Sequence, residues 1–286
     1  MIEDLVIQSF PQSKYIKKKG DNPLSILKLN NKIITLGGSV VTAIDYPVKG
    51  ELINMDLDGN GNKTYRVLSI DGKVVKVLGM NDISTSQVWG NGTANTVIMN
   101  GRAVAKYQDS DLDTYLNTTW YNTLSNAAKG AIVPQIIKQD AWEWGDDSGN
   151  PTYSGTYGES IPGTESYYIS KHAELTIGEK NVYALSMQEV TDYLNDSNTQ
   201  VDTTAVLRNV NIWKMFWNAE VHSSNYSNLW LRSARMGGSG PGMVWIVVGA
   251  VGSLDVTGSS FTAAVRPAFQ IDLSKIPFIK TTEVIS

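Results

Sequence analysis

The chain contains no cysteine, only two histidines and a modest share of charge, 18% of its 286 residues. The absence of cysteine excludes disulfides, thiolate metal sites and cysteine nucleophiles. Hydrolytic chemistry usually pairs a nucleophile with a histidine base, but His172 and His222 lie in no recognisable nucleophile or metal-binding motif. The sequence has no phosphate-binding loop and no dinucleotide fingerprint either. We therefore expect a protein that is not an enzyme and that uses no cofactor.

Long apolar runs and a basic patch are also missing. No stretch reaches the roughly 18 apolar residues that span a bilayer, since the apolar run at 243–251 is interrupted by Gly249. The formal net charge of −4 gives no electrostatic footprint for nucleic acid. The N-terminus lacks the apolar core of a secretory signal. We expect no membrane insertion, no nucleic-acid partner and no signal peptide, which fits a bacterial cytoplasmic protein or a virion protein assembled in a host cytoplasm.

Residues 1–45 read as a separate segment of the chain. A polar, proline-containing stretch leads to two short β-prone runs, Ile33–Leu36 and Val40–Ala43. Because so short a segment buries too little apolar surface for a core of its own, we expect it to pack on the main domain or on a partner. We interpret it as an attachment or oligomerisation segment that precedes a domain spanning residues 46–286.

Two helices are expected in the main domain. Apolar residues recur at helical spacing between residues 112 and 124, which predicts one helix within residues 109–130. A second helix is expected to begin at Ser186, where Ser186 and Glu189 have the spacing of a capping box. The long Gly-, Ser- and Tyr-rich region between these helices, residues 139–181, favours ordered surface loops.

Turn chemistry marks two places before the first helix. Asp71-Gly72 lies between β-branched runs and predicts a hairpin. Asp56, Asp58 and Asn60 alternate as the first ligands of a calcium loop do. The twelfth position of such a loop carries a bidentate glutamate, and here it would be Val67. A β-turn is therefore favoured over a metal site.

The stretch from Leu229 to Phe269 is unlike the rest of the sequence. Its two ends, Leu229–Ser233 and Val265–Phe269, read as a rigid frame, for which we name Trp230, Arg232, Arg266 and Pro267. Between Ser233 and Ala264 the chain has no lysine, glutamate or glutamine and is rich in glycine and apolar residues.

These endings carry a resemblance to a known family. The Leu229–Ser233 and Val265–Phe269 motifs resemble the closing pattern of an uncharacterised domain family of gut bacteria and their phages, over roughly residues 50–273. The resemblance implies an α+β, C-type-lectin-like (formylglycine-generating-enzyme-like) fold with two helices and antiparallel strands, preceded by the short β-prone N-terminal segment. Enzymes of that fold depend on cysteine, which this chain lacks.

The resemblance also implies a genetic origin for the unusual composition between Ser233 and Ala264. Many members of that family are variable proteins of diversity-generating retroelements, akin to a phage tropism determinant. There an error-prone copy rewrites asparagine codons into codons that never encode lysine, glutamate, glutamine, methionine or tryptophan. Met236, Met243 and Trp245 would then either belong to the frame or descend from another codon, such as AAG.

The resemblance also implies which of the remaining positions vary, through alignment with the family pattern on Gly252–Leu254 and on Val265. In the family, frame residues alternate with variable ones, as a half-buried strand requires. Val248 and Leu254 are expected to point inward. The positions expected on the ligand-binding face are Arg235, Gly237, Gly238, Val247, Gly249, Val251, Asp255, Thr257, Ser259, Ser260 and Phe261.

The expected function is ligand or receptor binding through this diversified surface. The partner would be a protein or glycan receptor on a host cell, and the protein would belong to a phage or prophage tail fibre. Self-association or tail-fibre attachment would use the N-terminal segment. The stretch is more apolar and richer in glycine than a diversified surface usually is. The alternative is therefore a non-diversified structural or surface-adhesion module.

Overall fold

The computed structural model describes residues 26–29, 32–35, 45–90, 95–145, 168–196, 215–217, 227–236, 242–249 and 253–281. The chain divides into two compact units, Met1–Asp45 and Tyr46–Ser286. In the first unit, β1 (Ile26–Leu29) and β2 (Lys32–Thr35) form an antiparallel hairpin. The run at 33–36 overlaps β2, whereas the run at 40–43 lies outside the described residues. The attachment role of this unit stays a prediction.

One sheet of the second unit has six strands in the order β17-β3-β4-β5-β16-β9, all antiparallel to their neighbours. The strands are β3 (Leu52–Met55), β4 (Lys63–Asp71), β5 (Val74–Gly79), β9 (Ile132–Val133), β16 (Ala268–Asp272) and β17 (Ile279–Lys280). The predicted hairpin is confirmed, because Asp71 ends β4 and Gly72 turns the chain with a φ of 61°. Glycine reaches this left-handed region without a steric penalty.

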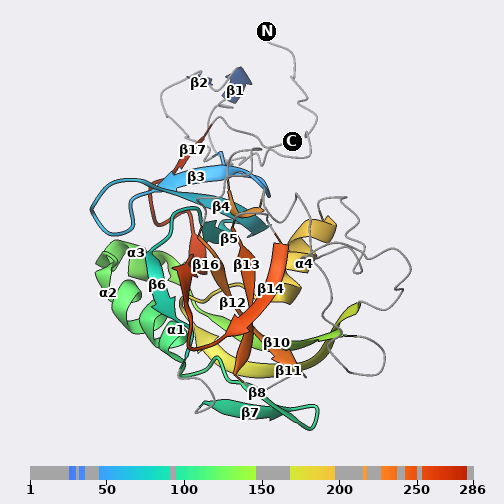
Figure 1. Cartoon of the computed structure of the whole chain (residues 1–286). Coiled ribbons are helices and arrows are strands. Elements are labelled where there is room, and N and C mark those ends of the chain that lie inside the picture. The colour runs from blue at the N-terminus through green and yellow to red at the C-terminus, as the bar shows by residue number, and fades with distance from the viewer. Residues whose placement is uncertain are drawn as a thin grey trace. The chain divides into compact units, whose positions relative to one another are not determined.

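A second sheet of seven strands carries the C-terminal stretch. Its order is β11-β10-β12-β13-β14, with β15 paired to β12 and β6 paired to β15. The strands are β6 (Ser84–Val88), β10 (Gln135–Gly145), β11 (Tyr168–Lys180), β12 (Leu229–Met236), β13 (Met243–Val248), β14 (Ser253–Gly258) and β15 (Thr262–Val265). Figure 1 shows β12, β13 and β14 between the β3–β5 sheet and the β10–β11 pair.

The expectation of surface loops over residues 139–181 is wrong for its two described ends. Residues 139–145 lie in β10 and residues 168–180 lie in β11, and these two long strands pair antiparallel. Alternation explains the start of β10: Ile137, Gln139 and Ala141 are buried, whereas Ile136 is 73% exposed. Residues 146–167 lie outside the described residues.

The first expected helix is broken into short pieces. They are α1 (Asp111–Thr114), the π-helical segment η1 (Tyr115–Trp120), α2 (Tyr121–Thr123) and α3 (Asn126–Ala131). The break lies at Leu124, whose ψ of 148° is extended, and Ser125 then caps a new helix by accepting from the Ala128 N–H. A serine that offers the backbone a local partner favours such a restart. The second expected helix is confirmed as α4 (Met187–Asp196).

The fold implied by the resemblance, an α+β, C-type-lectin-like domain with two helices, is therefore wrong. Strand residues far outnumber helical residues in the described part of the chain, and the helices are mostly single turns. The physical reason is that β-branched and aromatic residues at alternating positions form strands even inside Gly- and Ser-rich stretches.

The core of the second unit joins its two sheets and its helices. Trp89, Tyr107, Trp245 and Phe269 are among its largest fully buried side chains. The hairpin of β7 (Thr96–Met99) and β8 (Arg102–Ala105) carries a smaller apolar cluster against β12. No helix in the described ranges is long and apolar enough to cross a membrane.

Candidate ligand-binding surface

The motif Leu229–Ser233 contains a buried tryptophan, Trp230, whose side chain is fixed by a hydrogen bond. Trp230 is 3% exposed, and its indole N–H donates to the carbonyl of Gln87 in β6 at 2.6 Å. In the reverse sense, Trp89 donates from Nε1 to the carbonyl of Leu231 at 2.8 Å. Buried indole groups need such partners, because an unsatisfied buried donor is costly. These two bonds fix β12 to the segment around β6.

Arg232 is the centre of a buried ion-pair cluster. Its guanidinium donates to the Lys138 carbonyl at 2.7 Å, the Ala184 carbonyl at 2.6 Å and Glu189 Oε2 at 2.5 Å. The other carboxylate oxygen, Glu189 Oε1, meets Lys76 Nζ at 3.0 Å. A buried charge is tolerated when it is paired and hydrogen-bonded in this way.

The charges of this cluster set the ionisation of Glu189. Burial alone would raise the pKa of Glu189, but the charges of Arg232 and Lys76 lower this pKa to about 2. Burial would likewise lower the pKa of Arg232, and the Glu189 carboxylate raises it instead. Both groups are therefore ionised over the whole neutral range.

The serine of the motif holds the start of α4. Ser233 Oγ accepts from the Met187 N–H at 2.7 Å and donates to Asp140. The other oxygen of Asp140 accepts from the Gln188 N–H at 2.9 Å and from the Trp142 indole at 2.8 Å. A carboxylate at a helix N-terminus satisfies N–H groups that have no partner within the helix.

The predicted capping box is also present at this helix start. Ser186 N–H donates to Glu189 Oε2 at 3.0 Å, and Glu189 N–H donates to Ser186 Oγ at 3.1 Å. Sequence reasoning found the box but not its second use, because the same carboxylate binds Arg232. Asp140 was missed altogether, and alternation could not have found it, because the pattern that buries Ile137, Gln139 and Ala141 would place Asp140 on the outer face of β10.

The second half of the frame is fixed in a similar way. Arg266 donates to Asp82 Oδ1 at 2.7 Å and to the Phe216 carbonyl, and its guanidinium lies 5.1 Å from the ring centre of Trp217. Pro267 is buried, and its carbonyl accepts from the Gly79 N–H at 2.8 Å. All four predicted frame residues are thus inside the fold.

A hollow of about 230 Å³ opens beside the Arg232 cluster. It is lined by Lys76, Gln135, Ile136, Ile137, Lys138, Asp140, Glu174, Ser186, Gln188, Glu189 and Arg232. Its cations are engaged within the protein, since Lys138 Nζ also meets Glu174 at 2.9 Å. The N-terminus of α4, which could otherwise attract an anion, is occupied by Asp140. We therefore assign this hollow a structural role.

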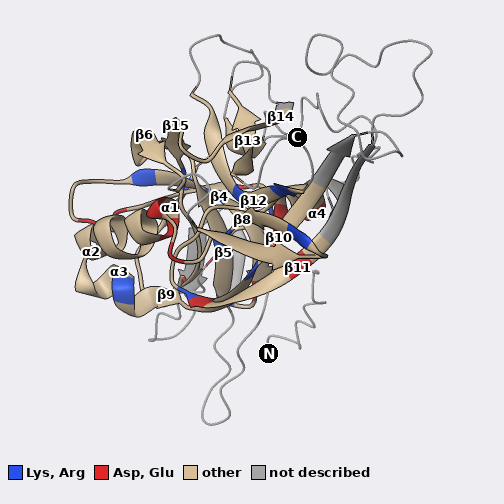
Figure 2. Ribbon diagram, turned by 60° about the horizontal axis from the view of Figure 1, so that its bottom comes forward, with Lys and Arg blue, Asp and Glu red and all other residues tan. Residues whose placement is uncertain are grey.

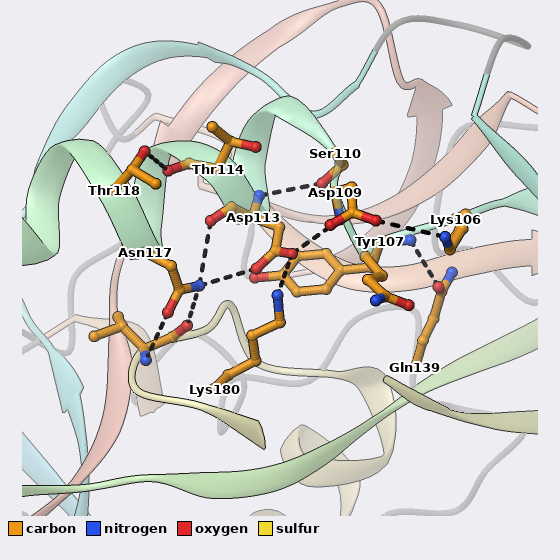
Figure 3. Close-up of polar contacts among 12 residues, drawn as sticks. Lys106, Tyr107, Asp109, Ser110, Asp113, Thr114, Asn117, Thr118, Gln139 and Lys180 are labelled. Atoms are coloured by element: carbon orange, nitrogen blue, oxygen red, sulfur yellow. Dashed lines mark hydrogen bonds and ion pairs between the residues drawn. The ribbon is translucent and has the colours of Figure 1, made fainter. Parts of the chain in front are cut away.

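A second polar cluster, drawn in Figure 3, joins the helical segment to β11. Asp113 accepts from Lys180 Nζ at 2.5 Å, Asn117 Nδ2 at 2.9 Å and the Asp109 N–H at 3.0 Å. Asn117 Nδ2 also donates to the Val182 carbonyl at 2.9 Å. Asp113 and Asn117 therefore use their polar groups within the protein, where they hold the helical segment against β11 and the residues that follow it. We assign this cluster a structural role.

The carboxylates of the Asp56 loop accept hydrogen bonds from backbone N–H groups of the same loop. Asp56 Oδ1 accepts from the Gly59 N–H at 2.8 Å, and Asp58 Oδ1 accepts from the Asn60 N–H at 2.9 Å. These are the local bonds of a turn. In the described ranges, no group of three or more His, Asp or Glu residues could hold a metal ion.

The positions expected on the binding face are divided by the structure. Gly237, Gly238 and Val251 lie outside the described residues. The buried positions are Arg235, Val247, Gly249 and Ser259. Asp255 and Thr257 are half-buried, and Ser260 and Phe261 are exposed.

The outward orientation expected for Val247 is wrong. Val247 is 0% exposed and lies opposite Leu254, which is buried as expected. Val248 packs against the core only partly buried. The reason is that β13 is buried on both faces, since the four consecutive residues Val244–Val247 are each at most 4% exposed. The accessible surface is therefore restricted to β14 and the turn that follows it.

That turn presents an aromatic side chain. Phe261 is 64% exposed, and its N–H donates to the Gly258 carbonyl at 3.0 Å. A side chain at Gly258 would meet Phe261 Cδ2 at 3.1 Å, so the ring rests against the glycine backbone. Figure 2 shows neither basic nor acidic colour on β13 and β15 beside it. We define the β14 surface as Asp255, Thr257, Ser260 and Phe261.

Asp255 is the titratable group of the β14 surface. Burial raises the pKa of Asp255 to about 6, against the opposing effects of the Val256 N–H bond and the charge of Arg235. The Val256 N–H donates to Asp255 Oδ1 at 2.7 Å. Its charge therefore changes near pH 6.

The fold and this surface define a sheet-rich domain with a buried frame and an accessible surface at β14 and the turn that follows it. The chain belongs to the family described as a domain of unknown function (DUF6273), whose model matches residues 83–273, more than half of the chain. No curated protein and no solved structure matches it.

Proposed function

We propose that this protein is a receptor-binding protein that recognises a protein or glycan on a host cell through the β14 surface. It would serve a phage or prophage, as a part of the tail fibre. The observation that carries the proposal is the contrast between neighbouring strands: the frame in β12 is sealed, whereas the β14 surface two strands away is accessible.

Composition supports the same surface. The stretch between Ser233 and Ala264 lacks lysine, glutamate and glutamine, and it contains the whole β14 surface. A scaffold held by buried side chains tolerates changes on such a surface, because surface substitutions usually alter stability by only about ±0.5 kcal/mol. Diversification of these positions by a retroelement is part of the proposal. If the positions are fixed, the alternative is an adhesion or structural module that uses one constant surface.

A binding assay with matched variants tests the surface. Fluorescently labelled full-length protein is applied to a panel of whole bacterial cells and to a glycan array. Phe261→Ala and Thr257→Ala should weaken any binding at least about tenfold, because exposed aromatics at recognition sites contribute strongly. Ile98→Ala is the control, since Ile98 is exposed on the separate β7–β8 hairpin. Equal binding by all three variants would refute the surface.

Sequencing of the DNA beside the gene tests diversification independently. The proposal predicts a reverse-transcriptase gene and a near-copy of the 3′ end of this gene, mismatched only at adenines of the template. Absence of that repeat would leave the constant-surface alternative.

A further inference from the structure

We propose that Lys180 and Asn117 form an intramolecular isopeptide bond, with Asp113 as the base and acid of the reaction. The bond is a secondary amide between Lys180 Nζ and Asn117 Cγ, and it joins the end of β11 to η1. The inference goes beyond the proposed function, because it involves neither the frame nor the β14 surface.

One carboxylate holds the amine and the amide beside each other. Asp113 Oδ2 accepts from Lys180 Nζ at 2.5 Å, and Asp113 Oδ1 accepts from Asn117 Nδ2 at 2.9 Å. Figure 3 shows both side chains turned toward Asp113. Groups that the fold brings together in this way react as parts of one molecule, without the entropic cost of meeting in solution.

Each of the three side chains has the chemistry that its role requires. A lysine ammonium has no free lone pair and becomes a nucleophile after a neighbouring base takes one proton. Asp113 is in place as that base, and it can return a proton to a leaving group. The carboxamide carbon of Asn117 is the electrophile, since its nitrogen leaves as ammonia. The carboxylate of Asp113 is a poorer electrophile, because its negative charge repels the attacking electron pair.

The backbone of Val182 orients the amide for attack. The Val182 carbonyl accepts from Asn117 Nδ2 at 2.9 Å, and the Val182 N–H donates to Asn117 Oδ1 at 3.3 Å. Negative charge develops on Oδ1 when an amine adds to Cγ. A fixed N–H donor at that oxygen stabilises the charge.

Burial favours this reaction over hydrolysis. The side chain of Asp113 is 4% exposed and that of Lys180 is 17% exposed. Tyr107 is fully buried nearby, where burial and then the charge of Asp113 raise its pKa well above the usual value. A site that holds little water protects both the tetrahedral intermediate and the product amide from hydrolysis. Burial also makes the separated charges of an ion pair costly, so transfer of a proton within the pair becomes easier.

The reaction balances without an oxidant or a second substrate. Asp113 Oδ2 takes one proton from Nζ, and the lone pair of Nζ forms the bond to Asn117 Cγ while the carbonyl electrons move to Oδ1. These electrons then return, the Cγ–Nδ2 bond breaks, and Asp113 delivers its proton to the departing nitrogen. Nζ gives up a second proton through Asp113, so an ammonium ion is released and the carboxylate is restored.

Mass spectrometry of the full-length protein under denaturing conditions tests the bond. The intact mass should be lower than that of the sequence by one ammonia, and a protease digest should contain a branched peptide that joins Lys180 to Asn117. An unchanged mass would overturn the proposal. So would the loss of one water with Lys180 joined to Asp113, or an ammonia loss without the branched peptide, because an asparagine can also lose ammonia by closing on its own backbone.

Two variants test the roles of the side chains. Lys180→Arg keeps a cation beside Asp113 but offers no amine, so it should have the full mass of its own sequence. Asp113→Ala removes the base and should also have the full mass, with circular dichroism showing whether it folds. If Asp113→Ala does not fold, Lys180→Arg and the mass of the native protein still decide the question. An ammonia loss that persists in Lys180→Arg would overturn the proposal.

Lys138→Arg is the matched control. Lys138 pairs with Glu174 at 2.9 Å, but this pair is largely exposed. The variant should keep both the ammonia loss and the branched peptide. Loss of the bond in Lys138→Arg as well as in Lys180→Arg would show that the reaction does not depend on the Asp113 cluster.

Discussion

The motif around Trp230 and the surface at β14 are two strands apart but differ in burial. In β12, the side chains of Arg232 and Ser233 are buried and have partners on β10 and α4. In β14, Asp255 and Thr257 are only half-buried, and Ser260 and Phe261 in the turn that follows are exposed. A buried network with every member paired fixes one arrangement, whereas exposed side chains can contact a partner.

The largest effect is expected from Trp230→Ala. The substitution removes a buried indole and leaves the Gln87 carbonyl without its donor. Large-to-small changes of this kind cost about 3–5 kcal/mol of unfolding free energy, which chemical denaturation will measure. A change near zero would show that Trp230 does not belong to the frame.

Breaking the ion-pair cluster around Arg232 should lower the free energy of unfolding nearly as much as Trp230→Ala does. Arg232→Met leaves the Glu189 carboxylate buried beside Lys76 alone, and loss of one partner of a buried pair costs about 3–5 kcal/mol. Lys138→Met is the matched control, because its pair with Glu174 is largely exposed and should contribute under about 1 kcal/mol. Similar losses in both variants would contradict the burial of the cluster.

This cluster also predicts a dependence on pH. The pKa of Glu189 is depressed to about 2, so its contribution is present above its unfolded pKa of about 4.3 and is lost as the pH falls toward 2. The difference between the native protein and Arg232→Met should therefore shrink in that acid range.

A smaller dependence of stability on pH, with the opposite sign, is expected from Asp255 in the β14 surface. The pKa of Asp255 is raised to about 6, above its unfolded value of about 3.9, so the native protein loses stability as the pH rises from about 4 to 6. Asp255→Asn should remove this loss, with a higher melting temperature than the native protein at pH 7 and a smaller difference at pH 4. A difference that is constant with pH would contradict the raised pKa.

Local signals in the sequence were sufficient for some elements. The Asp71-Gly72 hairpin and the Ser186–Glu189 capping box are confirmed, because each depends on residues that are neighbours in the chain. The burial of the frame was also predicted, since Trp230 and Pro267 are enclosed.

Long-range pairing was beyond those signals. The partners of Arg232 come from positions 138, 184 and 189, which no local pattern connects to it. The same limit explains the error at Val247: alternation predicts which residues share a face, but whether both faces of β13 are buried depends on the elements that pack on it, which no local pattern shows. The break in the helix at Leu124 depended on Ser125, a capping residue inside an otherwise helical pattern.

Hydrogen exchange of individual amides tests the contrast between the frame and the β14 surface most directly. The amide of Arg232, which lies in the enclosed frame and donates to the Leu185 carbonyl at 2.9 Å, should exchange at least about tenfold more slowly than the amide of Ser260 in the exposed turn after β14. Equal protection of the two amides would contradict the account.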